Sequence, residues 1–212
     1  TNLTFMAAKL ENIEESEKLA LEQKQKQCTP VEIPDDEKDE WMAAIEGANT
    51  KAADIIIAKE AKDIMDTFYR AQEEDDPALW EEAAGGLLTL YEREPEGEEA
   101  DKILWNAVLA YENCNKPQSA LKVVTKLVEN HPESEFMGDA LFKLAINAFN
   151  SFDYEQSLTQ FKIIADESRF KNSPHREKAI QNTALILENQ QKYTQAAGYW
   201  KKFGDFTKDK DK

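Results

Sequence analysis

The sequence predicts an all-α protein in which helical hairpins follow one another, and three observations support this prediction. Residues 101–132 form two segments with apolar residues at three- and four-residue steps, and the turn formers Asn115 and Pro117 lie between them. Small residues recur at intervals of 37, 37 and 39 residues, at Ala83, Ala120, Ser157 and Ala196. The 212 residues include only seven Gly and seven Pro, which favours helices with few tight turns. Because one hairpin cannot bury its apolar faces alone, the hairpins are expected to stack.

The first segment, residues 1–37, is expected to contain one polar helix and a linker. Residues 1–27 carry a thin apolar stripe that suits packing along a single neighbour, at Leu3, Met6, Leu10, Ile13 and Ala20. Pro30 and Pro34 interrupt helix geometry in the linker that follows.

The second segment, residues 38–100, is predicted to hold a long helix and an incomplete hairpin. Apolar residues at helical spacing place the long helix between about Asp39 and Glu73. Residues 80–95 match only the second helix of a hairpin. A longer and irregular helix pair is therefore expected at this end of the chain.

Three complete hairpins are predicted next, at residues 101–137, 138–176 and 177–206, before a tail at residues 207–212. Their spacing resembles that of the tetratricopeptide repeat family. With slots counted from Asp101, the family's large residue at slot 4, aromatic at slot 11, Ala at slot 20 and Pro at slot 32 fall on Leu104, Tyr111, Ala120 and Pro132.

The resemblance implies a right-handed α-α superhelix, a TPR-like solenoid of helical hairpins with longer irregular helices at the N-terminal end. One departure is Val108, which stands at slot 8 where the family has Gly or Ala and should loosen the approach of the two helices. A non-repeating helical bundle is the alternative.

In the tetratricopeptide family the first helix of each repeat lines a concave groove, and this assigns candidate partner-binding positions here. The predicted groove residues are Trp105, Leu109, Phe142, Ile146, Phe149, Gln181 and Leu185. Apolar residues facing a groove favour a protein or peptide partner, although they would also suit packing on adjacent repeats or on the helix of residues 1–27. Chaperone-binding members carry Lys and Asn where this chain has Trp105 and Leu109, which argues against a cochaperone role.

The chain contains no pattern typical of catalysis, of a cofactor site or of a metal site. His131 and His175 belong to no ligand motif and are expected to be exposed, and no Gly-rich phosphate loop or nucleophile elbow occurs. Acidic pairs such as Glu81 and Glu82 are expected on solvent-facing turns of helices, without a nearby His or Lys that would tune them for acid–base chemistry. We therefore expect a non-enzymatic protein without cofactor or metal. The sequence leaves open whether Cys28 and Cys114 pair.

Charge is distributed unevenly and bears on the partners. Residues 1–100 carry a net charge of −17 and residues 101–212 a net charge of +1. The acidic half should repel nucleic acid and anionic lipid and attract a basic partner, unless its acidic residues serve only to solvate turns. No apolar run approaches the roughly 18 residues of a membrane-spanning helix, so no transmembrane segment is predicted.

The joint after slot 32 is similar to the stretched repeats of bacterial cell-envelope proteins, including outer-membrane assembly lipoproteins and the periplasmic partner of the Tol-Pal system. The similarity rests on Pro132, Ser134 and the segments GDALFKLA and FDYEQSLTQF. It implies a non-catalytic scaffold in an envelope assembly for outer-membrane biogenesis, motility or secretion, periplasmic and associated with a membrane complex. The alternatives are a cytoplasmic location, and a spacer or oligomerisation module whose groove is filled by its own flanking helix.

Overall fold

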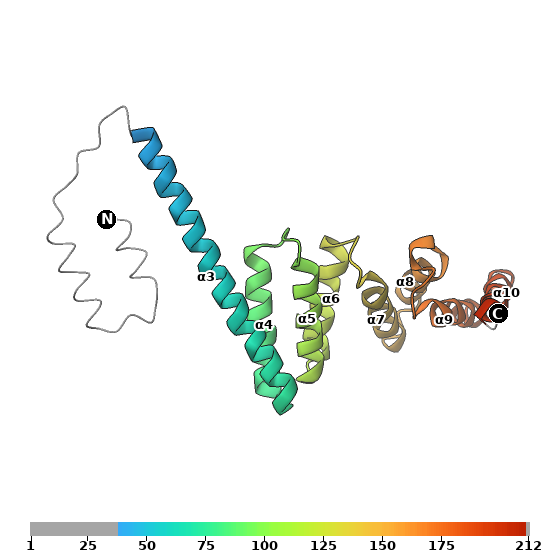
Figure 1. The fold of residues 1–212 in the computed structure, drawn as a ribbon. Helices are drawn as coiled ribbons and strands as arrows, with labels where there is room; N and C mark the ends of the chain where they lie inside the picture. The colour runs from blue at the N-terminus through green and yellow to red at the C-terminus, as the bar shows by residue number, and fades with distance from the viewer. Residues whose placement is uncertain (1–37, 211–212) are drawn as a thin grey trace. The chain divides into compact units, whose positions relative to one another are not determined.

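The structure is a computed structural model that describes residues 38–210, and within this range every regular element is helical. The elements are α3 (Lys38–Glu74), α4 (Pro77–Arg93), α5 (Ala100–Asn113), α6 (Pro117–Asn130), α7 (Met137–Asn150), α8 (Tyr154–Asp166), the 3-10 helix η1 (Ser168–Phe170), α9 (Arg176–Asn189) and α10 (Tyr193–Lys210) (Figure 1). The all-α prediction is confirmed for this part of the chain. The helix and linker predicted before residue 38 lie outside it.

The chain divides into two compact units, Thr1–Asp63 and Ile64–Lys212. The described part of the first unit is the beginning of α3. Its described side chains lie largely in solvent; Met42 is 65% and Ile55 67% exposed. The long helix predicted between about Asp39 and Glu73 corresponds to α3 within one residue at each end.

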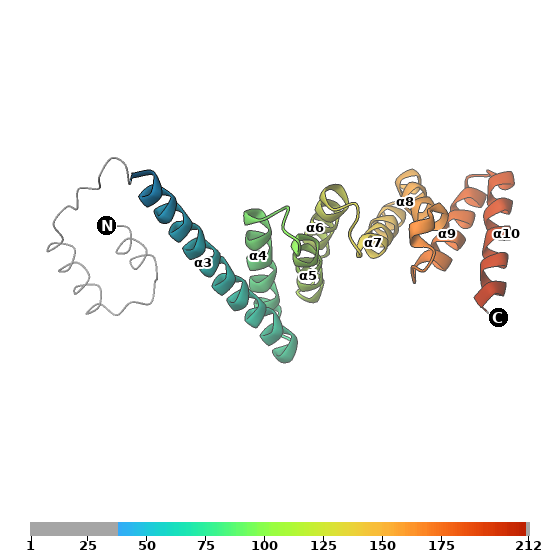
Figure 2. The same cartoon turned by 45° about the horizontal axis from the view of Figure 1, so that its top comes forward.

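The second unit begins with the last turns of α3, which pack against α4. The Phe68 ring meets the Trp80 ring edge-to-face, with 5.0 Å between ring centroids. From α4 to α10, extensive packing joins helices that are consecutive in the chain. Figures 1 and 2 show this succession from two directions, with α4 beside α5 and α9 beside α10 in both views.

The turns of the three predicted hairpins share one backbone geometry. Each first helix ends at an Asn, and the residue two positions later is left-handed, with φ of 56°, 63° and 59° at Asn115, Phe152 and Gln191. In the first turn the Asn115 N–H donates to the Glu112 carbonyl and the Lys116 N–H to the Tyr111 carbonyl, which is the Schellman arrangement. The same two hydrogen bonds recur in the turns after α7 and α9.

The small residues that mark the repeat are all in the core. Ala83, Ala120, Ser157 and Ala196 are 1%, 3%, 0% and 3% exposed. Val108, the departure from the family pattern, is also fully buried. The buried side chains form two clusters, and Val128 packs against both, so the core continues from one hairpin to the next.

The segment predicted as a tail, residues 207–212, continues α10 in helical conformation as far as Lys210. Two contacts explain the longer helix. Phe206 is half-buried against the second core cluster, and the Thr207 hydroxyl donates to the Phe203 carbonyl at 3.2 Å.

Candidate functional site

Three of the seven predicted groove residues meet in one cavity of about 550 Å³. We call it the aromatic cavity and define it by Trp105 on α5 and Phe142 and Ile146 on α7. The other four predicted residues do not line it. Leu109 and Gln181 are half-buried elsewhere, whereas Phe149 and Leu185 are 37% and 40% exposed.

Packing fixes the two aromatic rings of the cavity. Trp105 stacks on Phe136, which precedes α7, with ring centroids 5.2 Å apart and an interplanar angle of 8°. Phe142 stacks on His175 at 4.3 Å and meets the buried Phe161 edge-to-face at 5.7 Å. Both rings are therefore held by neighbours from other helices or joints, and the cavity is formed before any partner arrives.

The charged residues around the cavity are paired with one another. Lys143 Nζ lies 2.6 Å from Glu112 Oε1 and 5.8 Å from the centre of the Trp105 ring. His175 Nε2 lies 2.8 Å from Asp139 Oδ1, a contact that becomes an ion pair when the imidazole is protonated. These contacts link α5 to α7 and α7 to the start of α9, and they leave little net charge to bind a charged end group.

Neutral polar groups complete the wall. Asn147 and Asn150 of α7 line the cavity, and within residues 38–210 their side-chain amides have no hydrogen-bond partner. Pro117, Ala120 and Leu121 of α6 contribute apolar surface. An amide carries two donor hydrogens and an acceptor oxygen, so these two side chains can pair with the backbone of a bound segment.

Sequence reasoning missed several of these residues. His175 was expected to be exposed, but it is half-buried between Asp139 and Phe142, and His131 is likewise half-buried with Nε2 3.2 Å from the Tyr91 hydroxyl. Both contacts span about one repeat length in sequence, so no local motif reveals them. The recurrence of Asn at the end of each first helix was the one available signal for Asn150.

The expectation that Glu81 has no Lys near it is also wrong. Lys116, in the turn between α5 and α6, forms an ion pair with Glu81 of α4, and this hydrogen bond raises the pKa of Lys116. Both side chains are about half exposed, so the pair adds little to stability.

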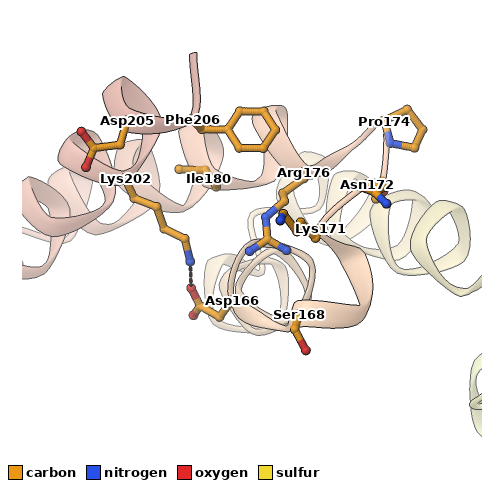
Figure 3. Close-up of a pocket in the computed structure, with 11 residues that line it drawn as sticks. Asp166, Ser168, Lys171, Asn172, Pro174, Arg176, Ile180, Lys202, Asp205 and Phe206 are labelled. Atoms are coloured by element: carbon orange, nitrogen blue, oxygen red, sulfur yellow. Dashed lines mark hydrogen bonds and ion pairs between the residues drawn. The ribbon is translucent and has the colours of Figure 1, made fainter. Parts of the chain in front are cut away.

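A second cavity, of about 780 Å³, lies where α8, η1, α9 and α10 meet (Figure 3). Asp166 is held there by the Tyr199 hydroxyl at 2.6 Å and by Lys202 Nζ at 2.7 Å. Burial raises the pKa of Tyr199 above its ordinary value, and the hydrogen bond to Asp166 raises this pKa further. Arg176 Nη1 donates to the Glu167 carbonyl at 2.7 Å, beyond the C-terminal end of α8. None of the predicted groove residues is part of this cavity.

The described residues contain no group of three or more His, Cys, Asp or Glu side chains placed to hold a metal ion. Cys114 is a free thiol, and Cys28 lies outside the described range. Between residues 38 and 210, no helix combines the length and the apolar character that crossing a bilayer requires.

Comparison of the chain with protein-family models gives no match, and a comparison with curated proteins gives none either.

Proposed function

We propose that this protein is a non-catalytic scaffold that binds a segment of another protein in the aromatic cavity. One observation carries the proposal: Trp105 and Phe142, chosen from equivalent positions of two hairpins, converge on a single preformed cavity. Its volume falls within the range of about 300–1,000 Å³ that ligand sites occupy. The combination of aromatic rings and side-chain amides in the lining suits an apolar side chain and the peptide bonds beside it.

The fixed rings favour binding at low entropic cost. Trp105 and Phe142 are each stacked against another ring, so a partner would order few further side chains of the scaffold. The internal pairing of the surrounding charges argues for an uncharged, apolar anchor on the partner rather than for a terminal carboxylate.

The wider context of the proposal is a TPR-like superhelix within a bacterial cell-envelope assembly. The shared hairpin turns and the nearly constant repeat interval support the repeat architecture. The resemblance of the joints between hairpins to those of bacterial envelope proteins supports a role in the cell envelope. The protein would then lie in the periplasm, and its partner would be part of a membrane-associated complex. A basic protein would suit the acidic residues of the N-terminal half.

The test is a selection of binding peptides from a random phage-displayed library on the full chain. Selected peptides should bind the Trp105→Ala/Phe142→Ala variant at least about tenfold more weakly, because buried aromatic anchors commonly carry more than about 2 kcal/mol of binding. Fluorescence polarisation measures affinity, and circular dichroism should show unchanged helix content. Tyr69→Ala/Tyr193→Ala is the matched control, since these rings are 55% and 64% exposed and lie outside the cavity.

Undiminished peptide binding by the Trp105→Ala/Phe142→Ala variant would remove the aromatic cavity from consideration. The self-filled alternative makes a different prediction for the same assay. If residues 1–27 occupied the cavity, deleting them would strengthen peptide binding rather than leave it unchanged.

A further inference from the structure

The second unit carries opposite charges on its early and late helices. Residues 73–101, from the end of α3 to the start of α5, include twelve acidic residues and one basic residue, a net charge of −11. Residues 168–208, from η1 through most of α10, include eight basic and three acidic residues, a net charge of +5. The helices α5 to α8 separate these two regions in the succession of packed helices.

The acidic region includes the loop between α4 and α5, Glu94–Glu99, which we call the acidic loop. The Gly97 N–H donates to the Glu94 carbonyl at 3.1 Å and the Ala100 N–H to the Gly97 carbonyl at 3.0 Å, so the backbone of the loop is fixed. Within the described part of the chain the exposed Glu96 and Glu98 carboxylates have no partner. Because the backbone of the loop is already ordered, its unpaired carboxylates can bind cations with little loss of conformational entropy.

The basic region contains the second cavity, which we call the basic cleft and define by Lys171, Arg176 and Lys202; the apolar Ile180 and Phe206 also line it. Figure 3 shows these side chains around the opening, with Lys202 joined to Asp166. Arg176 is turned toward main-chain carbonyls and has no carboxylate partner among the described residues.

Lys171 is the cation of the cleft that is most accessible to an approaching anionic group. Its side chain is exposed and makes no ion pair or hydrogen bond within residues 38–210. Asp205, on the α10 side of the cleft, is likewise exposed and unpaired there, and it opposes an incoming carboxylate. The lining of the cleft carries three cations, Lys171, Arg176 and Lys202, against the two carboxylates Asp166 and Asp205, and the resulting net charge of +1 favours an anionic loop.

We propose that the acidic loop of one copy of this chain docks in the basic cleft of a second copy. The chain itself supplies both complementary surfaces, and because they are different surfaces the contact is head-to-tail and can extend into open chains. The net charge of −16 opposes association at long range, but at physiological ionic strength screening acts within about 8 Å. Charges in direct contact then outweigh the distant ones, and the association should be weak and sensitive to salt.

Sedimentation velocity of the full chain tests the proposal. At about 0.1 M salt the average mass should rise above 24.2 kDa with increasing protein concentration, and at about 0.5 M salt it should return toward the monomer. Lys171→Glu and Glu96→Lys/Glu98→Lys should each weaken association by about tenfold or more. Asp205→Asn should strengthen it a few-fold, and Lys122→Glu on α6, an exposed charge change of the same sign outside the cleft, should have no effect.

A mixture of the two charge-reversal variants provides the sharpest test. The Lys171→Glu chain keeps its acidic loop and the Glu96→Lys/Glu98→Lys chain keeps its basic cleft, so the mixture should associate more strongly than either variant alone. Wild-type chain that stays monomeric at every concentration, or a mixture that fails to associate, would overturn the proposal. The Trp105→Ala/Phe142→Ala variant should self-associate normally, because the contact does not use the aromatic cavity, and this separates the two proposals.

Discussion

At the scale of single residues, Ser157 stands where three other repeat positions have Ala. Its side chain is fully buried, and within the described part of the chain its hydroxyl has no hydrogen-bond partner. A buried hydroxyl without a partner loses its hydration and gains nothing in return, which typically costs about 1–3 kcal/mol. The equivalent Ala83, Ala120 and Ala196 show that a methyl group fits this position.

Ser157→Ala should therefore raise the free energy of unfolding by about 1 kcal/mol, measured by urea denaturation. Ala120→Ser, which places a hydroxyl at the equivalent position of the preceding hairpin, should lower it by a similar amount. A destabilised Ser157→Ala protein would show that the hydroxyl is hydrogen-bonded after all.

Some backbone conformations and side-chain contacts cannot be predicted from the local sequence. Asn115 is a residue type that tolerates left-handed backbone, but Phe152 and Gln191 adopt the same conformation without that preference. Their conformation follows from the closure of the hairpin, which packing dictates and local propensity does not. His175 is a similar case, since its contact with Asp139 depends on how the hairpin that begins with α9 packs on the preceding one.

At the scale of the element, two adjacent glycines distinguish the buried and exposed faces of α4. A Cβ on Gly86 would lie 2.8 Å from Ile64 Cγ1 of α3, whereas a Cβ on Gly85 would meet nothing within 4 Å. The close approach of α3 to α4 in the second unit thus depends on the missing side chain at Gly86. Neither glycine has positive φ, so backbone freedom is not the reason for their presence.

Gly86→Ala should lower the free energy of unfolding by about 1 kcal/mol, because overpacking of about 1–3 kcal/mol exceeds the gain in helix propensity. Gly85→Ala should raise it by about 0.5–1 kcal/mol through propensity alone. Chemical denaturation of both variants gives the comparison. If Gly86→Ala were as stable as Gly85→Ala, the contact between Ile64 and α4 would have to be looser than its geometry indicates.

The elements themselves were largely predictable, and the cavity was only partly so. Apolar periodicity located α3 because its stripe persists for many turns, and the recurrent Ala positions located the hairpins. The continuation of α10 through residues 207–210 was not predicted, because the composition after Phe206 is polar and shows no apolar period. Of the groove residues, those brought together lie on α5 and α7, since the cavity forms between two neighbouring hairpins and does not continue to Gln181 and Leu185 of α9.

At the scale of the whole molecule, the succession of helix contacts determines how stability is distributed. Extensive packing between α4 and α10 joins only consecutive helices, so each helix is stabilised mainly by its immediate neighbours. In such an arrangement stability approximates a sum of local and nearest-neighbour contributions, and helices with one packed side open more readily than those with two. The described side chains at the start of α3 are largely exposed, so among the described residues this stretch gains little stability from packing.

Hydrogen exchange followed by mass spectrometry should therefore show graded protection. Amides of α6, α7 and α8 should exchange slowest, those of α10 after Phe203 at least about tenfold faster, and those of α3 before Ile64 fastest of all. The measurement belongs at low protein concentration and about 0.5 M salt, so that self-association does not protect α10 or the acidic loop. Uniform protection from α4 to α10 would indicate one cooperative globule instead, and the neighbour-by-neighbour basis of the proposed repeat scaffold would fail with it.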